Sequence, residues 1–293
     1  MSEKLKKGQT APLETDIRKI SINLIDGFPN HPFYVFDDDE MSDLTESIRR
    51  NGLISPVIVR KKADRFELIS GHRRKHACEL LGHDEIACRI VEASDDEAII
   101  MMVDSNCQRT KVLPSERAFA YKMKLEALKK QGARSDLTSR QIVGKLETAD
   151  LVGKGSGESG RQVQRFIRLT NLIPELLNMV DEKKLAFNPA VELSYLDEAQ
   201  QRDFLEAMND TQNAPSLSQA QRLKKLALEG HFSYDAAFAV MGEAKKDELD
   251  KVVIKNDTLR KYFPRSYTPK QMEDTIIKLL EQWQRKRQRQ NER

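Results

Sequence analysis

The chain of 293 residues is long enough for two or three small domains, each with its own core. It is 39% hydrophobic and 32% charged, and no apolar run approaches the length of a membrane span, which argues against an integral membrane protein. The formal net charge of +3 is too small to indicate a nucleic-acid partner by itself. Any affinity for DNA must therefore come from local clusters of basic residues.

The N-terminus and the cysteines indicate a cytoplasmic protein. No apolar segment follows the lysine-rich residues 1–9, so a secretory signal is not expected. Cys78, Cys88 and Cys107 form no Cys-x-x-Cys pair and lack zinc-type spacing with histidine. Reduced thiols are the simplest interpretation.

The first part of the chain predicts a mixed α and β domain over residues 17–112, preceded by a flexible arm at 1–16. Gly52 stands at the C-cap position of the first helix, and Ala63-Asp64 joins two strands into a hairpin. The apolar periodicity and the turn residues place the individual elements. Strands are predicted at 20–24, 56–60, 65–70 and 86–91, and helices at 41–51, 72–82 and 95–106.

The turn from the strand at 65–70 into the next helix carries the strongest chemical signal. Gly71 allows the backbone to approach a ligand closely, and the helix N-terminus offers free N–H groups and the positive end of its dipole. Arg73, Arg74 and Lys75 add full positive charges. The pattern predicts a polyphosphate site, although a solvated basic first turn has the same residues.

From residue 113 onward the pattern is helical and predicts an all-α domain over 113–231. Pro114 fits the first position of a helix that continues to Gly132. The later apolar stripes predict four more helices, at 189–196, 198–208, 218–229 and 234–241.

Two short capped helices predict a helix-turn-helix motif. One capping box opens a helix over 138–146, a second opens a helix over 160–172, and polar, glycine-rich residues 148–158 connect them. Arginine and glutamine suit direct readout of guanine and adenine. An amphipathic helix with a solvated polar face is the alternative. The candidate DNA contacts are Thr138, Ser139, Gln141, Ser159, Arg161, Gln162, Gln164, Arg165 and Arg168.

Residues 232–293 are predicted to form a small, mostly helical C-terminal domain. Residues 252–254 have the pattern of a strand, and Thr268-Pro269 begin a long helix with an apolar stripe that ends at Trp283. The stripe suits a dimer contact or packing within its own domain. The basic tip at 285–289 suits contact with DNA phosphates or a solvated tail.

Taken in order, these motifs resemble the ParB/RepB family of plasmid and chromosome partition proteins. Gly71-His72-Arg73-Arg74-Lys75-His76-Ala77 is similar to the family's GERRxRA box, and Ser105-Asn106-Cys107-Gln108-Arg109 to its ENxxR box. The resemblance covers roughly residues 18 to 230. It extends to the stretch before the nucleotide pocket, the start of the central helices, the helix-turn-helix and the segment behind it, at residues 41–59, 113–116, 138–172 and 187–196.

The resemblance implies an α+β, ParB/sulfiredoxin-like N-terminal domain that binds CTP, a helical domain that binds a palindromic centromere-like site, and a C-terminal dimerisation domain. It further implies a homodimer that closes on double-stranded DNA as a CTP-dependent clamp and works with a ParA-type ATPase. Asn106 would also face a magnesium ion bound to the nucleotide. Carried over by position, the nucleotide contacts are Gly71, His72, Arg73, Arg74, Asn106 and Arg109.

Two positions depart from the family pattern. His72 stands where the family usually has glutamate, and Ser105 replaces the glutamate of ENxxR that the family needs for CTP hydrolysis. A serine hydroxyl without an activating partner does not act as a general base. The sequence therefore predicts CTP binding with slow or absent hydrolysis, and no catalytic residue is assigned.

Two other functions fit parts of the pattern. A transcriptional regulator or a nucleoid-occlusion-like protein has the same parts, and the sequence does not separate these from partition. The Gly71-His72-Arg73 turn also resembles that of sulfiredoxins and of related free-serine kinases. A sulfiredoxin needs a cysteine just before this turn, where the chain has Ser70. The helix-turn-helix also argues against a stand-alone enzyme.

Overall fold

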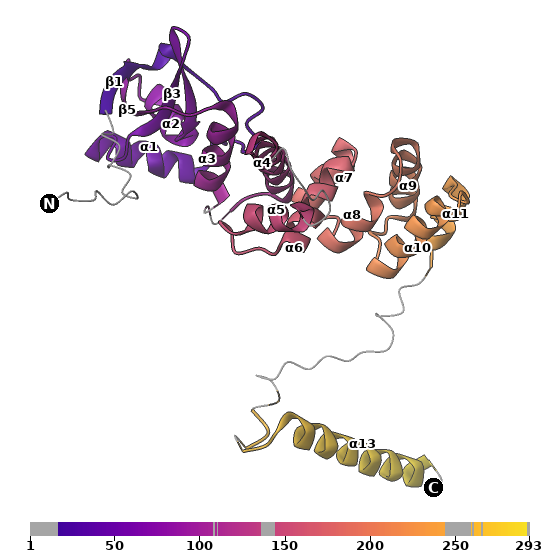
Figure 1. The fold of residues 1–293 in the computed structure, drawn as a ribbon. Coiled ribbons are helices and arrows are strands. Elements are labelled where there is room, and N and C mark those ends of the chain that lie inside the picture. The colour runs from indigo at the N-terminus through magenta and orange to yellow at the C-terminus, as the bar shows by residue number, and fades with distance from the viewer. Residues whose placement is uncertain are drawn as a thin grey trace, which may run out of the picture. The chain divides into compact units, whose positions relative to one another are not determined.

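The computed structural model describes residues 17–107, 109, 111–135, 144–243, 259, 261–264 and 266–291 (Figure 1). The chain divides into two compact units, Met1–Glu243 and Ala244–Arg293. The arm predicted at 1–16 and the strand predicted at 252–254 lie outside the described residues, and so do Thr138, Ser139 and Gln141. In the part of the chain that is described, no helix combines the length and apolarity that a membrane span needs.

The first unit begins with a five-stranded mixed sheet in the order β1-β5-β3-β4-β2. The sequence placed one strand at 20–24, but a short 3-10 helix at Ile22–Leu24 interrupts it and separates β1 from β2. The other three strands lie where they were predicted. The strands are β1 (Ile17–Ser21), β2 (Ile25–Asp26), β3 (Val57–Lys62), β4 (Arg65–Ser70) and β5 (Glu85–Val91).

Helices cover both faces of this sheet because its strand residues alternate between two cores. Val57 and Val59 face the core that includes Met41 and Ile48 of α1 (Asp39–Asn51) and Ala77 and Cys78 of α2 (His72–Leu80). Ile69 lies in the other core, with Ala98 and Met102 of α3 (Asp95–Cys107) and Ala120 of α4 (Pro114–Ser135). The predicted α+β N-terminal domain followed by helices is confirmed.

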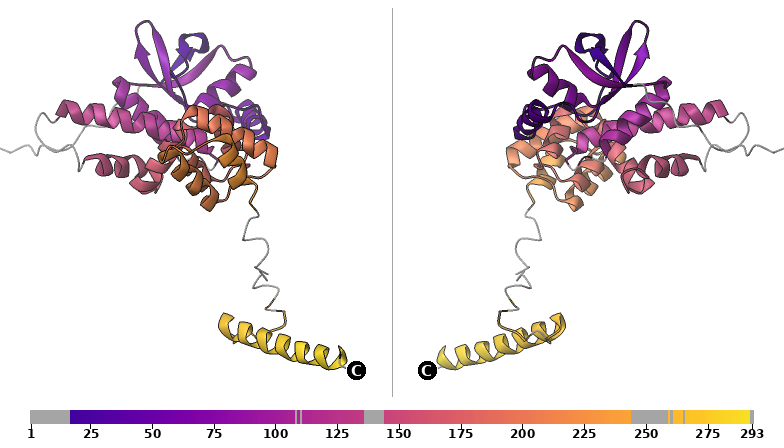
Figure 2. Two further views of the ribbon diagram at one scale, coloured as in Figure 1. Left: turned by 90° about the vertical axis from the view of Figure 1, so that its right-hand side faces the viewer. Right: turned by 90° about the vertical axis from the view of Figure 1, so that its left-hand side faces the viewer.

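The helices from α4 onward share a third core and lie beyond the sheet in the first unit (Figures 1 and 2). The sequence predicted most of them but missed α7, which begins at Pro174 in the N1 position. The helix predicted at 160–172 ends at Arg168, and a 3-10 turn, Leu169–Asn171, follows it. The remaining helices are α5 (Gly144–Gly153), α6 (Gly160–Arg168), α7 (Pro174–Asp181), α8 (Phe187–Leu193), α9 (Glu198–Thr211), α10 (Leu217–Leu228) and α11 (Tyr234–Met241).

The first helix of the helix-turn-helix motif does not end at Leu146 as predicted. It continues as α5 to Gly153, because Ala149 and Val152 are three residues apart on one face and both are buried. The connection is therefore only residues 154–159, which is closer to the length of an ordinary turn than the predicted linker.

The helical part also continues past residue 231. Ala237, Val240 and Met241 of α11 are buried in the same core as α9, and the compact unit ends at Glu243. The sequence placed the start of a C-terminal domain at residue 232.

The second unit contains the predicted long helix, α13 (Pro269–Asn291). A capping box begins it: Thr268 Oγ1 accepts from Gln271 N at 3.3 Å, and Gln271 Oε1 accepts from Thr268 N at 2.9 Å. Met272 is buried, whereas Leu279, Leu280 and Trp283 are between 57% and 58% exposed. The described residues therefore leave most of the apolar stripe exposed.

Candidate nucleotide and DNA sites

Gly71 is placed at the start of α2 by two requirements that favour glycine. Its φ of +105° lies in the left-handed region, and a Cβ at this position would lie 2.7 Å from Cγ1 of Val57. Because glycine has no side chain to cap α2, the N–H groups of the first turn have no side-chain cap. The helix therefore presents its positive end, as an anion site requires.

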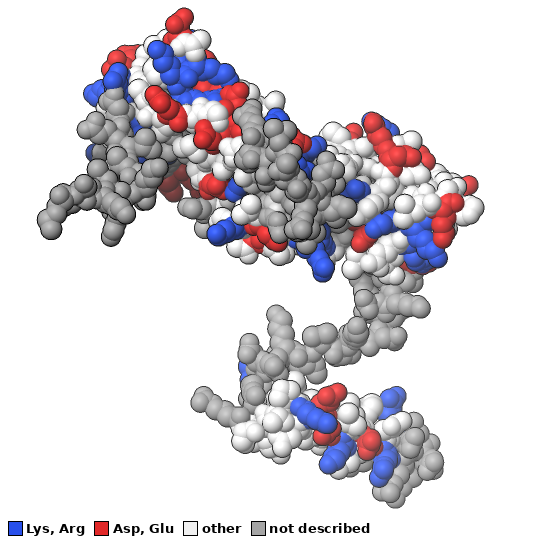
Figure 3. All heavy atoms as spheres, in the orientation of Figure 1, with Lys and Arg blue, Asp and Glu red and all other residues white. Residues whose placement is uncertain are grey.

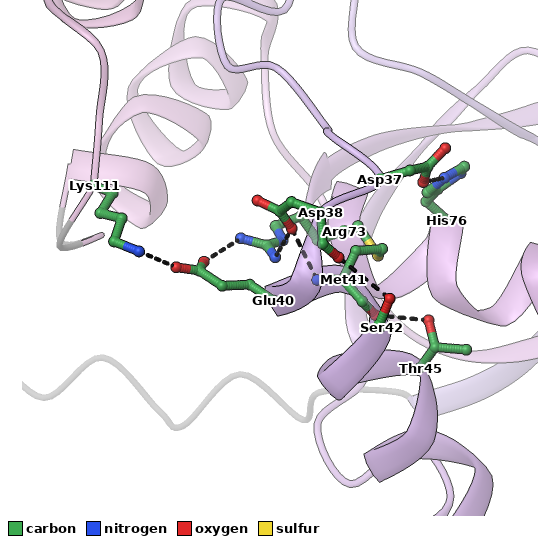
Figure 4. A network of polar contacts seen from close by, with 9 residues as sticks. All are labelled: Asp37, Asp38, Glu40, Met41, Ser42, Thr45, Arg73, His76 and Lys111. Atoms are coloured by element: carbon green, nitrogen blue, oxygen red, sulfur yellow. Dashed lines mark hydrogen bonds and ion pairs between the residues drawn. The ribbon is translucent and has the colours of Figure 1, made fainter.

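Arg73, on the first turn of α2, lies in a network with the acidic N-terminus of α1 (Figure 4). Its Nη1 donates to Glu40 Oε2 at 3.1 Å, and its Nη2 is 3.4 Å from Asp38 Oδ1. Lys111 Nζ donates to the other oxygen of Glu40 at 2.6 Å. The hydrogen bond from Lys111, followed by that from Arg73, lowers the pKa of Glu40. One exposed carboxylate thus bridges two cations.

A cavity of about 440 Å³ lies beside this network. That volume is in the range of small-molecule pockets. Four cations, four carboxylates and two aromatic rings contribute to its wall, together with several apolar side chains. The lining residues are Tyr34, Phe36, Asp38, Glu40, Arg73, Arg109, Lys111, Val112, Leu113, Pro114, Glu116, Val180, Asp181 and Lys183.

Two of the cavity carboxylates, Glu116 and Asp181, accept hydrogen bonds from the segments that form its wall. Glu116 is 4% exposed and accepts from the backbone N–H groups of Tyr34 at 2.6 Å and Leu113 at 2.9 Å. Asp181 accepts from the N–H of Ser115 at 2.9 Å and from its hydroxyl. These bonds explain why the Leu113-Pro114-Ser115-Glu116 segment carries buried polar side chains. They fix the loop before α1 and α7 against the start of α4.

Arg74 does not line the cavity. Its Nη1 donates to the carbonyl oxygens of Ser55 at 2.8 Å and Pro56 at 2.9 Å, and burial lowers the pKa of its guanidinium. Arg74 therefore joins α2 to the segment before β3. Its predicted contact with phosphate would have to compete with these two carbonyl groups.

His72 is half-buried and lies against a second histidine, His31, from the loop before α1. The rings of His31 and His72 lie 3.7 Å apart at their centroids, and neither Nε2 has a hydrogen-bond partner among the described residues. The Nδ1–H of His31 donates to the carbonyl of Phe33 at 2.7 Å. Burial, assisted by His31 and Lys75, lowers the pKa of His72 to about 3. A neutral ring therefore stands at the position of the glutamate in the GERRxRA pattern.

Of the second nucleotide motif, residues 105–109, one residue lines the cavity. Arg109 lines it, whereas the amide Nδ2 of Asn106 donates to Met102 O at 2.9 Å within α3. The Ser105 hydroxyl also donates to Met102 O at 2.9 Å, and its other hydrogen bond in the described structure comes from Asn106. Neither bond supplies a general base. The described residues contain no group of three or more His, Cys, Asp or Glu side chains that would hold a metal ion, and the predicted role of Asn106 toward magnesium stays a prediction.

The predicted recognition helix is α6. Ser159 caps it by accepting from Gln162 N at 3.3 Å, and the N–H of Gly160 donates to Asp150 of α5 at 2.5 Å. Arg161 and Gln164 are exposed on this helix. On the face shown in Figure 3, positive and negative side chains are interspersed, so any DNA affinity depends on local placement of charge.

The two remaining arginines of α6 are tied to the segment that follows α7. Arg165 Nη2 donates to Asn188 Oδ1 at 2.5 Å. Arg168 Nη2 donates to the carbonyl of Ser194 at 2.7 Å, and its guanidinium lies 3.7 Å from the ring centroid of Tyr195. Arg168 thus braces α6 against the end of α8.

The sequence reasoning missed the loop before α1 and the residues that close the cavity. Tyr34 and Phe36, which are 55% and 54% exposed, form a conspicuous aromatic run, and this was the available signal. Glu40, Lys111 and Lys183 had no local signal, because they reach the cavity only through the fold.

Residues 6–107 match the family described as the ParB N-terminal domain. The probable chromosome 1-partitioning protein ParB of Deinococcus radiodurans is 30% identical over 188 residues, which cover 63% of this chain and 59% of that protein. The chain is therefore similar to ParB proteins, through the domain match at residues 6–107 and this longer alignment. It matches about three fifths of the length of this curated ParB relative.

Two solved ParB structures are also similar. The C-terminally truncated chromosome-partitioning protein ParB from Caulobacter crescentus, complexed to the centromeric parS site, matches 78% of this chain and 100% of that chain, with 19% identity and a TM-score of 0.43. The complex of a C-terminally truncated ParB from the same organism with CTP-gamma-S matches 61% of this chain and 92% of that chain, with 22% identity and a TM-score of 0.30.

Proposed function

We propose that this chain is a ParB-type, sequence-specific DNA-binding protein whose N-terminal domain binds CTP and which acts in the segregation of a plasmid, a mobile element or a chromosome. One observation carries the nucleotide part: a single cavity is lined by Arg73 of the first motif and Arg109 of the second. The uncapped N-terminus of α2 adds backbone donors beside Arg73.

The cavity contains residues suited to the phosphates and residues suited to the base of a nucleotide. Arg73, Arg109, Lys111 and Lys183 supply positive charge for phosphates, and Tyr34 and Phe36 supply rings of the kind on which a base can stack. A magnesium ion would neutralise part of the triphosphate charge when bound. The described residues contain no group of three or more His, Cys, Asp or Glu side chains that would hold it, so in this proposal its ligands are chiefly phosphate oxygens.

In this proposal the helix-turn-helix binds a palindromic site as a homodimer. The exposed Arg161 and Gln164 of α6 contact the major groove, while Arg165 is positioned by Asn188. CTP converts the dimer into a clamp that leaves its site along double-stranded DNA, and a ParA-type ATPase moves the complex. Ser105 has no activating partner in the described structure, so hydrolysis is slow or absent.

The decisive test compares CTP with ATP, GTP and UTP by calorimetry on the full chain. CTP should bind more tightly than the other three, and Arg109→Ala should weaken it about tenfold or more. Arg49→Ala is the matched control, because Arg49 is an exposed arginine that pairs with Glu46 outside the cavity. Equal binding of all four nucleotides would overturn the CTP assignment.

A second experiment tests the clamp. A DNA duplex enriched from random sequence by the wild-type chain is placed in closed circles and in linear fragments. CTP should cause retention on the circles and loss from the open ends. Indifference to CTP on both substrates would leave a DNA-binding protein without a nucleotide switch.

A further inference from the structure

The four cations that line the cavity differ in the partners they already have. Arg73 and Lys111 both pair with Glu40, at 3.1 Å and 2.6 Å. The side chains of Arg109 and Lys183 form no hydrogen bond or ion pair with any residue that the structure describes. Two cations of the cavity are therefore available to a ligand.

The four carboxylates of the cavity have partners of their own. Asp38 caps the N-terminus of α1, and Glu40 bridges two cations. Glu116 and Asp181 accept from backbone N–H groups. A ligand that brings its own negative charge is therefore the partner that suits the two unpaired cations.

Lys183 is held in the cavity wall by a backbone conformation that favours glycine. It follows α7 with a φ of +61°, in the left-handed region. The N–H of Lys183 donates to Val180 O at 3.1 Å, and the N–H of Lys184 donates to Met179 O at 2.9 Å. These are the two hydrogen bonds of a Schellman motif, whose left-handed residue is most often glycine.

At two other helix ends the chain has glycine in this conformation. Gly82 follows α2 with a φ of +71°, and Gly230 follows α10 with a φ of +73°. A lysine in the left-handed region costs free energy that a glycine does not. Such strain is often found at functional sites, and Lys183 lines the cavity.

We propose that Lys183 and Arg109 bind the terminal phosphate of the nucleotide, so that the site selects a nucleoside triphosphate over the diphosphate. This inference rests on the proposed CTP site. The uncapped start of α2 and Arg73 lie together and suit the inner phosphates. A third phosphate adds negative charge and acceptor oxygens, which match the two cations that have no other partner.

Calorimetry of the full chain with CTP and with CDP, each with magnesium and at low salt, tests this assignment. The wild type should bind CTP about tenfold more tightly than CDP, or more. Lys183→Gly should lower that ratio about fivefold or more through weaker binding of CTP, while its affinity for CDP stays within about twofold of the wild type. Lys183→Arg should keep the ratio, because it keeps the charge.

Lys183→Gly also separates binding from folding, because glycine adopts the left-handed conformation without strain. Its thermal midpoint should rise by about 1–3 °C, so that a lost preference for CTP does not arise from unfolding. Lys183→Asn, which tolerates the same conformation, should lose the preference as well.

Two control variants isolate the charge and the backbone. Gln212 ends α9 with a φ of +51° and does not line the cavity, so Gln212→Gly should raise the midpoint and leave the ratio unchanged. Lys184 is the next lysine in the chain and pairs with Glu182. Lys184→Met should also leave the ratio unchanged.

The outcomes are distinguishable. An unchanged ratio in Lys183→Gly, or an equal loss of affinity for CTP and CDP, overturns the assignment of Lys183 to the terminal phosphate and leaves the proposed function intact. A wild type that binds CTP and CDP equally does the same. A wild-type chain that binds no CTP overturns the proposed function and this inference together.

Discussion

The two proposed ligand-binding regions, the start of α2 and the recognition helix α6, each contain two arginines with different roles. At α2, Arg73 lines the cavity, whereas Arg74 is bonded to the carbonyls of Ser55 and Pro56. At α6, Arg161 is exposed, whereas Arg168 is bonded to Ser194 beyond α8. Arginines of one motif are therefore not equivalent: one faces the cavity or the solvent, where a ligand can reach it, and the other holds the scaffold.

The largest expected effect comes from the bracing residue at α2. Arg74→Ala removes two charge-assisted hydrogen bonds and leaves two carbonyl groups without their donor. We expect a loss of about 3 kcal/mol in the free energy of unfolding, measured by chemical denaturation.

Arg74→Ala should also weaken nucleotide binding, because α2 loses its attachment to the segment before β3. Arg109→Ala is the contrasting variant and should weaken CTP with little change in stability. An unchanged denaturation midpoint in Arg74→Ala would break the distinction between bracing and binding arginines.

His72, which lies against His31 at the start of α2, predicts a pH dependence of stability. The unfolded chain has an ordinary histidine pKa near 6.5, whereas burial lowers that of folded His72 to about 3. Between these values the unfolded state binds more protons, so stability falls as the pH falls from about 6.5. The loss should approach but not exceed about 3 kcal/mol by about pH 4.

Denaturation curves of the wild type and His72→Gln across this range measure the effect. The slope should flatten in His72→Gln and persist in His83→Gln, because His83 is exposed. An identical slope in His72→Gln would show that other groups determine the acid sensitivity.

At the recognition helix, the comparison predicts opposite effects for two arginines. Arg161→Ala should lower affinity for the selected DNA duplex by about 1–3 kcal/mol and leave stability unchanged. Arg168→Ala should cost about 1–2 kcal/mol of stability, because it loses the Ser194 carbonyl and the face of Tyr195. Fluorescence anisotropy measures the DNA affinity of the two variants, and chemical denaturation measures their free energy of unfolding. If both lose only DNA affinity, Arg168 is a reading residue as well.

The sequence predicted the elements whose ends carry a specific residue. Gly52, Pro114, Ser159 and Thr268 all cap or begin helices as expected. It failed for α5, where polar residues next to buried Ala149 and Val152 were interpreted as a linker. Local composition is ambiguous there, and packing against α4 and α6 decides the structure.

The candidate site was predictable only as two separate motifs. Their positions along the chain indicated an anion site, but the partners of each arginine come from distant segments. Ser55 and Pro56 lie well before Arg74, and Asn188 lies well after Arg165. No local pattern distinguishes a guanidinium that meets a carbonyl from one that faces a cavity.

The smallest expected effect concerns Glu40, whose carboxylate pairs with two cations of the cavity wall. Its carboxylate bridges Arg73 and Lys111, and both of these line the cavity. A triphosphate would have to displace it from the same two cations. Glu40→Gln should therefore strengthen CTP binding by about threefold at low salt, and by less as salt screens these exposed groups.

Calorimetry at two salt concentrations measures the effect of this substitution. Glu46→Gln is the matched control, because this exposed carboxylate on α1 pairs with Arg49 and Arg50 outside the cavity. Weaker binding of CTP by Glu40→Gln would mean that the Glu40 carboxylate favours binding, for example by contacting the magnesium ion that accompanies the nucleotide. Arg73 would then be positioned by its carboxylate partners, and the division between available and bracing arginines would have to be redrawn at α2.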